Sequence, residues 1–269
     1  MHLEQITPLI LTYNEETNID RTLSKLTWAS QILIVDSYSD DRTLEISTSY
    51  PQTKILQRKF DTHANQWNYG LQQICTEWVL SLDADYQISR QLLTEIENLS
   101  IDDSVNGYFI PFRYCVFGKP LRGTILPARQ ALFKKNKAIY IDDGHTQLLQ
   151  IDGLSSSLEK AIYHDDRKPL SRWLWAQDRY LKIEAEKLST TSWSDLSWGD
   201  RIRTLKFLAP FIILFYCLIL KGGVLDGWRG WYYAFQRMLA EMLLSLRLIE
   251  QNFLEVLPNS AGQDSKRSV

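Results

Sequence analysis

Two aspartates separated by one residue, Asp83 and Asp85, follow an apolar run at residues 78–82. Carboxylates at this spacing, on a loop that leaves a buried strand, can both reach one ligand or ion. Mg²⁺ and Mn²⁺ prefer oxygen ligands, typically one or two carboxylates together with substrate phosphates. The pair therefore predicts a divalent metal site. The alternative is a turn before the helix that follows Ser89, because Asp is common in turns.

Polar side chains also follow two earlier apolar runs. Asn14 and Glu15 come after the run at residues 7–13, and Asp36 ends the run at residues 31–36. Ligands of open parallel sheets bind at the carboxyl ends of the strands, so we expect these side chains to share one site with the aspartate pair. The chain contains neither GxGxxG nor GxxxxGK[ST]. It therefore does not predict an NAD site or a P-loop.

The elements that must position these residues alternate in type along the first hundred residues. Strands are predicted at 7–13, 31–36, 53–56 and 78–82, and helices at 15–26, 41–49, 63–75 and from Ser89 onward. This alternation predicts a parallel sheet covered by helices. Shorter strands at 107–112, 130–133 and 147–151 predict a mixed extension of the sheet. We expect a first domain over residues 1–190, a helical region over 191–256 and a disordered tail over 257–269.

The region from 191 to 256 carries an apolar segment of unusual composition. Residues 207–220 contain no charge, and Lys206 and Lys221 flank them. Their 14 residues are fewer than the roughly 20 that span a bilayer. Six of the nine tryptophans lie beyond residue 170, and Trp favours the membrane interface. These features predict attachment to a membrane surface, with a buried helical pair or a dimer interface as the alternatives.

Charge and cysteine content exclude several classes. The net charge of −2 argues against a nucleic-acid partner bound by bulk electrostatics. The three cysteines are far apart and form no CxxC pair, so neither a disulfide framework nor a zinc site is expected. No signal peptide precedes the first strand. We therefore expect a cytoplasmic protein, peripheral on the inner face of the plasma membrane.

Four segments, in order and at the expected spacing, resemble the family 2 glycosyltransferases: LTYNEETNI, ILIVDSYSDDRT, ANQWNYGL and EWVLSLDAD. Two later segments, DDGHTQLLQIDG and YHDDRKPLSRWLWAQDRY, are similar to a bacterial branch that assembles lipopolysaccharide cores and other cell-envelope glycans. The resemblance implies a GT-A fold, a nucleoside-diphosphate sugar donor, a divalent metal and inversion at the anomeric carbon. It also implies a glycan or lipid-linked acceptor.

The resemblance assigns roles to individual residues of the donor and metal sites. Thr12, Tyr13 and Glu15 would surround the nucleoside, and Asp36 would bond the base. Asp83 would lie near the ribose and Asp85 would bind Mg²⁺ or Mn²⁺ under the diphosphate, with Asp83 as a second ligand. His164 would complete the metal shell, although a lone His is as often structural.

The base and the leaving-group cations are assigned less narrowly. The base is sought among Asp142, Asp143 and His145, with Asp143 preferred, since inversion needs a carboxylate or His close to the acceptor hydroxyl. Thr146 stands where related enzymes usually have Glu, and a simple β-turn is the alternative for either aspartate. The cations Arg167 and Lys168 would neutralise the diphosphate, with a solvated charge run as the alternative. Further cation candidates are Arg122 and Arg129.

Two other functions stay open at this stage. A sugar nucleotidyltransferase usually carries a Gly-rich loop with a basic residue after its first strand, and TYNEETN has neither. A catalytically inactive membrane adaptor with a glycosyltransferase-like fold is the other alternative. The intact pair of Asp83 and Asp85 argues against that adaptor.

Overall fold

The computed structural model describes residues 1–100, 104–143 and 146–256. The chain divides into two compact units, Met1–Pro169 and Leu170–Val269. The division falls at the start of the helix α5 (Leu170–Thr190) and not at residue 190, where the sequence placed it. The reason is that Leu181 and Leu188 of α5 share a hydrophobic cluster with Leu244 and Leu248 of the last helix. The tail predicted over 257–269 lies outside the described residues.

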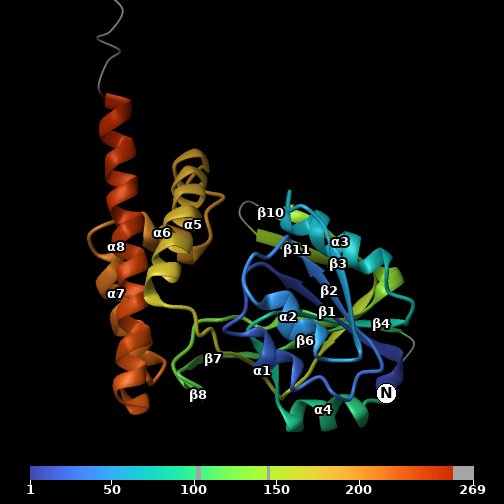
Figure 1. Ribbon diagram of the computed structural model, residues 1–269. Helices are drawn as coiled ribbons and strands as arrows, with labels where there is room; N and C mark the ends of the chain where they lie inside the picture. Colours follow the sequence, from blue (N-terminus) through green and yellow to red (C-terminus); the bar gives the residue numbers. More distant parts are fainter. Residues whose placement is uncertain (101–103, 144–145, 257–269) are drawn as a thin grey trace, which may run out of the picture. The chain divides into compact units, whose positions relative to one another are not determined.

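The first unit contains a seven-stranded sheet with the strand order β12-β6-β9-β4-β1-β2-β3. Its strands β1, β2, β3, β4 and β6 are labelled in Figure 1. Its strands are β1 (Ile6–Thr12), β2 (Ile32–Asp36), β3 (Thr53–Gln57), β4 (Trp78–Asp83), β6 (Val105–Ile110), β9 (Arg129–Lys134) and β12 (Leu154–Ser157). Strands β4, β1, β2 and β3 are parallel neighbours, whereas β9 runs antiparallel to β4 and β6. The predicted mixed sheet is confirmed.

Two hydrophobic cores lie on opposite faces of this sheet, because alternate residues of a strand point to opposite sides. Ile32 and Ile34 of β2 belong to the first core, together with residues of α1 (Ile19–Leu23) and α4 (Arg90–Glu97). Leu33 and Val35 belong to the second core, together with α3 (His63–Gln72). A further helix, α2 (Thr43–Thr48), contacts α1 and β3. The sheet is thus covered by helices on both faces, as predicted.

Helix α3 approaches the sheet closely at Gly70. A Cβ atom at this position would lie 2.6 Å from Leu9 Cδ1 and 3.1 Å from Val35 Cγ2. Both of these side chains are fully buried, so neither has free space to move into. Glycine therefore sets the short distance between α3 and strands β1 and β2.

Two smaller sheets complete the first unit. One consists of β10 (Ala138–Asp143) and β11 (Thr146–Ile151) alone. The other has the order β5-β13-β7-β8. Its strands are β5 (Tyr86–Ile88), β13 (Ile162–His164), β7 (Phe112–Val116) and β8 (Lys119–Pro120). The sequence did not predict this second sheet, because its strands are short and pair over long distances in the chain.

Helix α1 is shorter than the predicted helix at residues 15–26. The carbonyl of Glu15 accepts hydrogen bonds from the backbone N–H groups of Asn18 and Ile19, and the helix begins only at Ile19. Asn14, just before, has a φ of +56°. The chain between Asn14 and Asn18 therefore forms a turn whose side chains serve the site described below.

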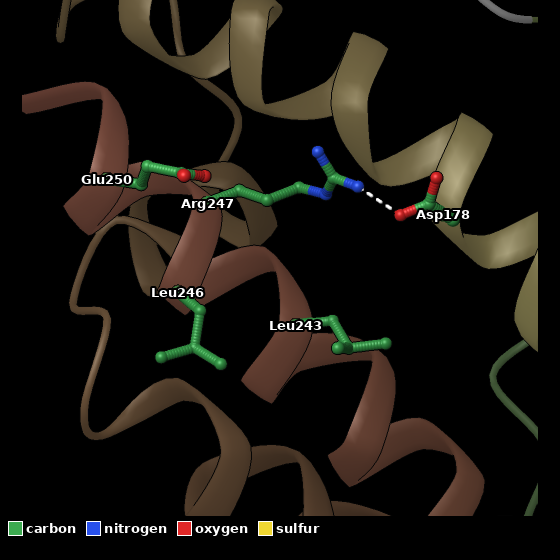
Figure 2. Close-up of a pocket in the computed structure, with 5 residues that line it drawn as sticks. All are labelled: Asp178, Leu243, Leu246, Arg247 and Glu250. Carbon is green, nitrogen blue, oxygen red and sulfur yellow. Dashed lines mark hydrogen bonds and ion pairs between the residues drawn. The ribbon is translucent and has the colours of Figure 1, made fainter. Parts of the chain in front are cut away.

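The second unit is helical. Besides α5 it contains α6 (Trp198–Arg203), α7 (Ala209–Phe215), a π-helical turn at Tyr216–Leu220 and the long helix α8 (Trp228–Val256). Figure 2 shows a hollow between α5 and α8, where Arg247 forms an ion pair with Asp178. None of the site residues predicted from the sequence lines this hollow. Among the helices described, none is long and apolar enough to cross a bilayer.

Candidate active site

The loops that follow β1 and β2 are joined into one ledge at the carboxyl edge of the sheet. The side chain of Asn14 donates to Asp40 Oδ1 at 2.7 Å and accepts from the Asp40 backbone N–H at 3.0 Å. The N–H of Glu15 donates to Thr43 Oγ1 at 2.7 Å, and the N–H of Ser37 donates to the carbonyl of Thr12. Residues far apart in the sequence thus form one rigid surface.

Asp36 lies beneath this ledge and is completely buried. Its carboxylate accepts from Thr12 Oγ1 at 2.9 Å, from Ser39 N–H at 2.9 Å and Ser39 Oγ at 2.5 Å, and from Gln57 Nε2 at 3.4 Å. A carboxylate has about four acceptor positions, and these donors take all of them. In this structure Asp36 therefore organises the two loops, and Thr12 does so with it.

Two aromatic rings are exposed on the same loops. Tyr13 follows Thr12, and Tyr38 lies two residues after Asp36. Tyr38 has a φ of +61°, a left-handed backbone conformation that is uncommon for a residue with a bulky side chain. Such conformations persist where the surroundings enforce them, often at functional sites. The sequence assigned Tyr13 to the nucleoside but gave no role to Tyr38.

The loop after β4 brings Asp85 against His164 of β13. His164 Nε2 lies 3.0 Å from Asp85 Oδ2. Strands β5 and β13 are antiparallel neighbours, with His164 opposite Tyr86, and this pairing places the imidazole beside the aspartate. The structure therefore brings together two of the three metal ligands that the sequence proposed.

Both members of this pair have a buried polar atom without a hydrogen-bond partner, Asp85 Oδ1 and His164 Nδ1. Leaving a buried acceptor or donor unpaired is costly, so these atoms mark a place where a ligand would be stabilised. In the part of the chain that the structure describes, no group of three or more His, Cys, Asp and Glu side chains is arranged to hold a metal ion.

Burial and the neighbouring charge act in opposite directions on this pair. Desolvation favours the neutral carboxyl group, but His164 and Lys168 together with a backbone hydrogen bond hold the pKa of Asp85 below its ordinary value. Desolvation likewise favours the neutral imidazole, but Asp85 and more distant carboxylates raise the pKa of His164. The pair is therefore stabilised as carboxylate and imidazolium.

Glu15 and Lys168 form a second, partly buried pair near the first. Lys168 Nζ contacts Glu15 Oε1, and the other oxygen of Glu15 accepts from Asn18 Nδ2 at 2.9 Å. Burial raises the pKa of Glu15 to about 7, although Lys168 acts in the opposite direction. Asp85 also raises it, which shows that Glu15, Lys168 and Asp85 share one electrostatic environment.

Arg167, the other predicted cation, forms an ion pair with Asp165 of the same loop. Its Nε and Nη2 atoms contact the buried carboxylate of Asp165, at 2.9 Å and 2.8 Å for Oδ2. Arg21 also lies near this carboxylate, and the Gly118 N–H donates to it at 3.0 Å. Asp165 therefore joins the loop after β13 to the loop between β7 and β8, and Arg167 is held by this carboxylate.

Arg129 lies nearer to the aspartate pair than the sequence indicated. Strand β9 pairs antiparallel with β4 from Trp78–Lys134 to Leu80–Leu132, and Arg129 is the first residue of β9. Its Nη1 donates to Tyr86 Oη at 3.2 Å, and it interacts electrostatically with Asp83 and Asp85. The side chain is exposed and forms no ion pair with a described carboxylate. Asp83 thus faces Tyr86 and Arg129, outside the pair of Asp85 and His164.

The three candidates for the base fall at the end of β10. Asp142 Oδ1 accepts from the Ala64 N–H in the first turn of α3 at 3.3 Å. The register pairs Asp143 with Thr146, so Asp143 closes the β10–β11 pairing. The side chain of Asp143 and the whole of His145 lie outside the described residues. Among the three candidates, only Asp142 has a side chain within the described residues, and its hydrogen bond to Ala64 holds β10 to α3.

The family model for glycosyl transferase family 2 matches residues 9–152, which is more than half of the chain. The chain belongs to this family. The matched residues include all the loops that form the ledge, the aspartate pair and the end of β10. Strand β13, which carries His164, and the loop after it, which carries Lys168, lie beyond the match.

Relatives of known name are similarly glycosyltransferases. A lipopolysaccharide core biosynthesis glycosyltransferase of Rhizobium meliloti is 21% identical over 266 residues, 94% of this chain and 95% of the relative. An uncharacterized glycosyltransferase of Rickettsia bellii is 29% identical over 107 residues, and that match spans 39% of this chain and 36% of the relative.

A solved structure with a similar fold is a mannosyltransferase of Pyrobaculum calidifontis in complex with GDP-Man and Mn²⁺. It is 14% identical, has a TM-score of 0.50, and covers 94% of this chain and 88% of its own. This likeness shows a shared fold and supports the predicted GT-A architecture of this family 2 member.

Proposed function

We propose that this chain is an inverting glycosyltransferase that moves a sugar from a nucleoside-diphosphate donor to a glycan or lipid-linked acceptor of the cell envelope. The observation that carries the proposal is the unpartnered, buried Oδ1 atom of Asp85 beside His164, at the sheet edge where Glu15 and Asp36 also lie. Family membership supports a donor of this class. The GDP-Man and Mn²⁺ held by the structural neighbour point the same way.

The residues at this edge fit Mg²⁺ or Mn²⁺ together with a diphosphate. Such ions often take only one or two protein carboxylates and complete their shell with phosphate oxygens and water. Asp85 would hold the ion through its free oxygen, with His164 or Asp83 beside it. When bound, the ion would neutralise negative charge that develops on the departing diphosphate.

The chain's own residues supply the remaining parts of the reaction. The exposed rings of Tyr13 and Tyr38 flank the surface that would receive the nucleoside, and Asp36 keeps their loops in place. Arg129 would contact the diphosphate, because it is an exposed cation that interacts electrostatically with both aspartates. The oxygen of the acceptor hydroxyl would attack the anomeric carbon from the face opposite the leaving group, and Asp143 would take the proton of that hydroxyl.

Attachment to a membrane surface would bring this enzyme to a lipid-linked acceptor. In the second unit, Phe211 and Phe215 of α7 are 63% and 57% exposed, and they lie one helical turn apart on the same face. The Arg201 guanidinium lies over the rings of Trp193 and Trp198, at 5.6 and 5.5 Å. Apolar side chains bordered by tryptophan and cations are typical of helices that lie in the bilayer interface.

Binding to vesicles tests this attachment. The wild type should sediment with vesicles rich in anionic lipid, less so as salt rises, because each cation near such a surface adds about 1 kcal/mol. Replacing Phe211 and Phe215 with Glu should abolish sedimentation. A wild type that stays monodisperse without detergent and ignores anionic vesicles at low salt would assign this surface to a protein contact instead.

The donor is tested by thermal shift with UDP-glucose, UDP-N-acetylglucosamine and GDP-mannose, each with Mn²⁺ or with a chelator. A ligand at 100 times its Kd stabilises the protein by about 2.7 kcal/mol. We expect one nucleotide class to stabilise the protein, and to do so only with the metal. Conversion of the nucleotide sugar and added pyrophosphate into a nucleoside triphosphate and sugar 1-phosphate would indicate a nucleotidyltransferase. The absence of any nucleotide effect would indicate an inactive adaptor.

A further inference from the structure

Strand β10 lacks the support that a strand in a larger sheet receives. In the described part of the chain its only strand partner is β11. An isolated two-stranded hairpin is marginally stable in water unless something packs against it. Because β10 ends at Asp142 and Asp143, whatever supports the strand also controls where these two residues lie.

The side chain of Asn68, on α3, pairs with the free edge of β10. Asn68 Nδ2 donates to the Tyr140 carbonyl at 2.8 Å, and Asn68 Oδ1 accepts from the Tyr140 N–H at 3.0 Å. The N–H and C=O of one strand residue point to the same edge, so Tyr140 turns these groups away from β11 and towards α3. The amide group of Asn68 therefore takes the place of a residue of a third strand.

Two further contacts hold the same strand to the same helix. The ring of Trp67, next to Asn68, stacks on the ring of Tyr140 with 5.3 Å between centroids and 20° between planes. The Ala64 N–H donates to Asp142 Oδ1. Contacts from one helix thus reach the last residues of β10 at both Tyr140 and Asp142.

The opposite side of α3 contacts the loops that form the ledge after β1 and β2. Gln66 is fully buried, and its Nε2 donates to Ser37 Oγ at 3.0 Å and to the Arg58 carbonyl at 3.1 Å. Ser37 directly follows Asp36, and its N–H is bonded to Thr12. One rigid helix therefore contacts both the donor side of the site and β10.

We propose that Asn68 is a positioning residue, which fixes β10 so that the end of this strand, at Asp142 and Asp143, stands at a constant place relative to the donor. The inference rests on the proposed function. Asn68 touches neither predicted donor residue nor predicted metal ligand. Its loss should therefore slow transfer and leave nucleotide affinity unchanged, since even small misplacement of a reacting group lowers the rate steeply.

The test compares Asn68→Ala and Asn68→Asp with the control Asn65→Ala. The Asn68→Asp variant keeps an acceptor for the Tyr140 N–H but offers no donor to the Tyr140 carbonyl, and the size of the side chain is unchanged, so folding should survive. Asn65 lies on the same helix, is exposed, and donates instead to Asp61 at 3.1 Å. The measurements are hydrogen exchange of residues 138–143, the Kd of UDP and GDP with Mn²⁺, and kcat with the sugar donor that the wild type uses.

Both Asn68 variants should exchange the amides of residues 138–143 about tenfold faster and transfer sugar at least about tenfold more slowly, with nucleotide Kd within about twofold of the wild type. Asn65→Ala should match the wild type in all three. Wild-type exchange and kcat in both Asn68 variants would overturn the proposal, and so would a parallel loss of nucleotide affinity. If the wild type binds neither nucleotide, the proposed function fails, and hydrogen exchange still measures the hold of Asn68 on β10.

Discussion

Replacing Asn18 with aspartate should destabilise the first unit strongly, although the two side chains have the same shape. Asn18 is fully buried and uses every hydrogen-bonding position of its amide. Its Nδ2 donates to Glu15 and to Asp166, each at 2.9 Å, and its Oδ1 accepts from Arg21 at 2.7 Å and from the Arg167 N–H at 2.9 Å. The substitution keeps both accepted bonds and removes both donated ones.

The magnitude follows from the two lost bonds, since each joins the amide to a carboxylate. A hydrogen bond to a charged group is worth at least about 1.5 kcal/mol, so the loss is about 3 kcal/mol. For a unit of this size that corresponds to a fall in Tm of about 6–12 °C. Repulsion among three carboxylates would add to this loss, but Glu15 limits it, because burial raises the pKa of Glu15 to about 7 and a proton relieves the charge.

Because Glu15 takes up a proton near pH 7, the stability lost in the Asn18→Asp variant depends on pH. In the wild type, charged Glu15 is disfavoured in the folded state, so stability falls as pH rises from the unfolded pKa of 4.5 through about 7. In the Asn18→Asp variant a protonated Glu15 also donates to the introduced carboxylate, so the deficit should be smaller at pH 6 than at pH 8. Differential scanning fluorimetry at both values measures it, with Asn65→Asp as an exposed control that should change little. An unchanged Tm, or a deficit independent of pH, would refute this account of the network.

Three substitutions probe the chemistry. Asp85→Ala should abolish the stabilisation by nucleotide that depends on Mn²⁺, as read by thermal shift; retention of a full metal effect would remove Asp85 from the metal site. Arg129→Met should raise the Kd for UDP or GDP roughly tenfold to a hundredfold by calorimetry, whereas Arg90→Met, a control at the start of α4, should not. Asp143→Asn should keep nucleotide affinity and reduce the transfer rate about 10²–10⁴-fold; if Asp142→Asn or His145→Ala does so instead, the base lies there.

Strands β1, β2 and β4 were predictable because they are largely buried on both faces and read as apolar runs. Strand β2, for example, begins one residue later than predicted and ends at Asp36 as predicted. The loop positions of Glu15, Asp36 and Asp85 followed from these strand ends.

Relations that depend on pairing across long stretches of chain could not be predicted in the same way. The contact between His164 and Asp85 depends on the pairing of β13 with β5, and the position of Arg129 depends on the register of β9 with β4. The saturation of Asp36 by Thr12, Ser39 and Gln57 was equally hidden, because hydrogen-bonding groups from three segments converge there only in the folded chain.

The polar residues of α3 give a signal in the sequence that points to buried partners. Gln66 and Asn68 stand in a helix whose neighbours Trp67 and Leu71 are buried, so polar side chains there must satisfy specific partners. Their spacing alone did not reveal that the partners belong to β10 and to the loops after β2 and β3.

The narrow gap at Gly70 constrains how this chain can diverge during evolution. Any larger residue there collides with Leu9 and Val35, so a viable change at position 70 requires a compensating loss of volume in β1 or β2. Without that compensation α3 would be displaced outward, and both the ledge and β10 would move with it. Substitutions at positions 9, 35 and 70 should therefore occur together among related sequences. Changes at these three interior positions would affect the site through the position of α3, although none of the three residues contacts it.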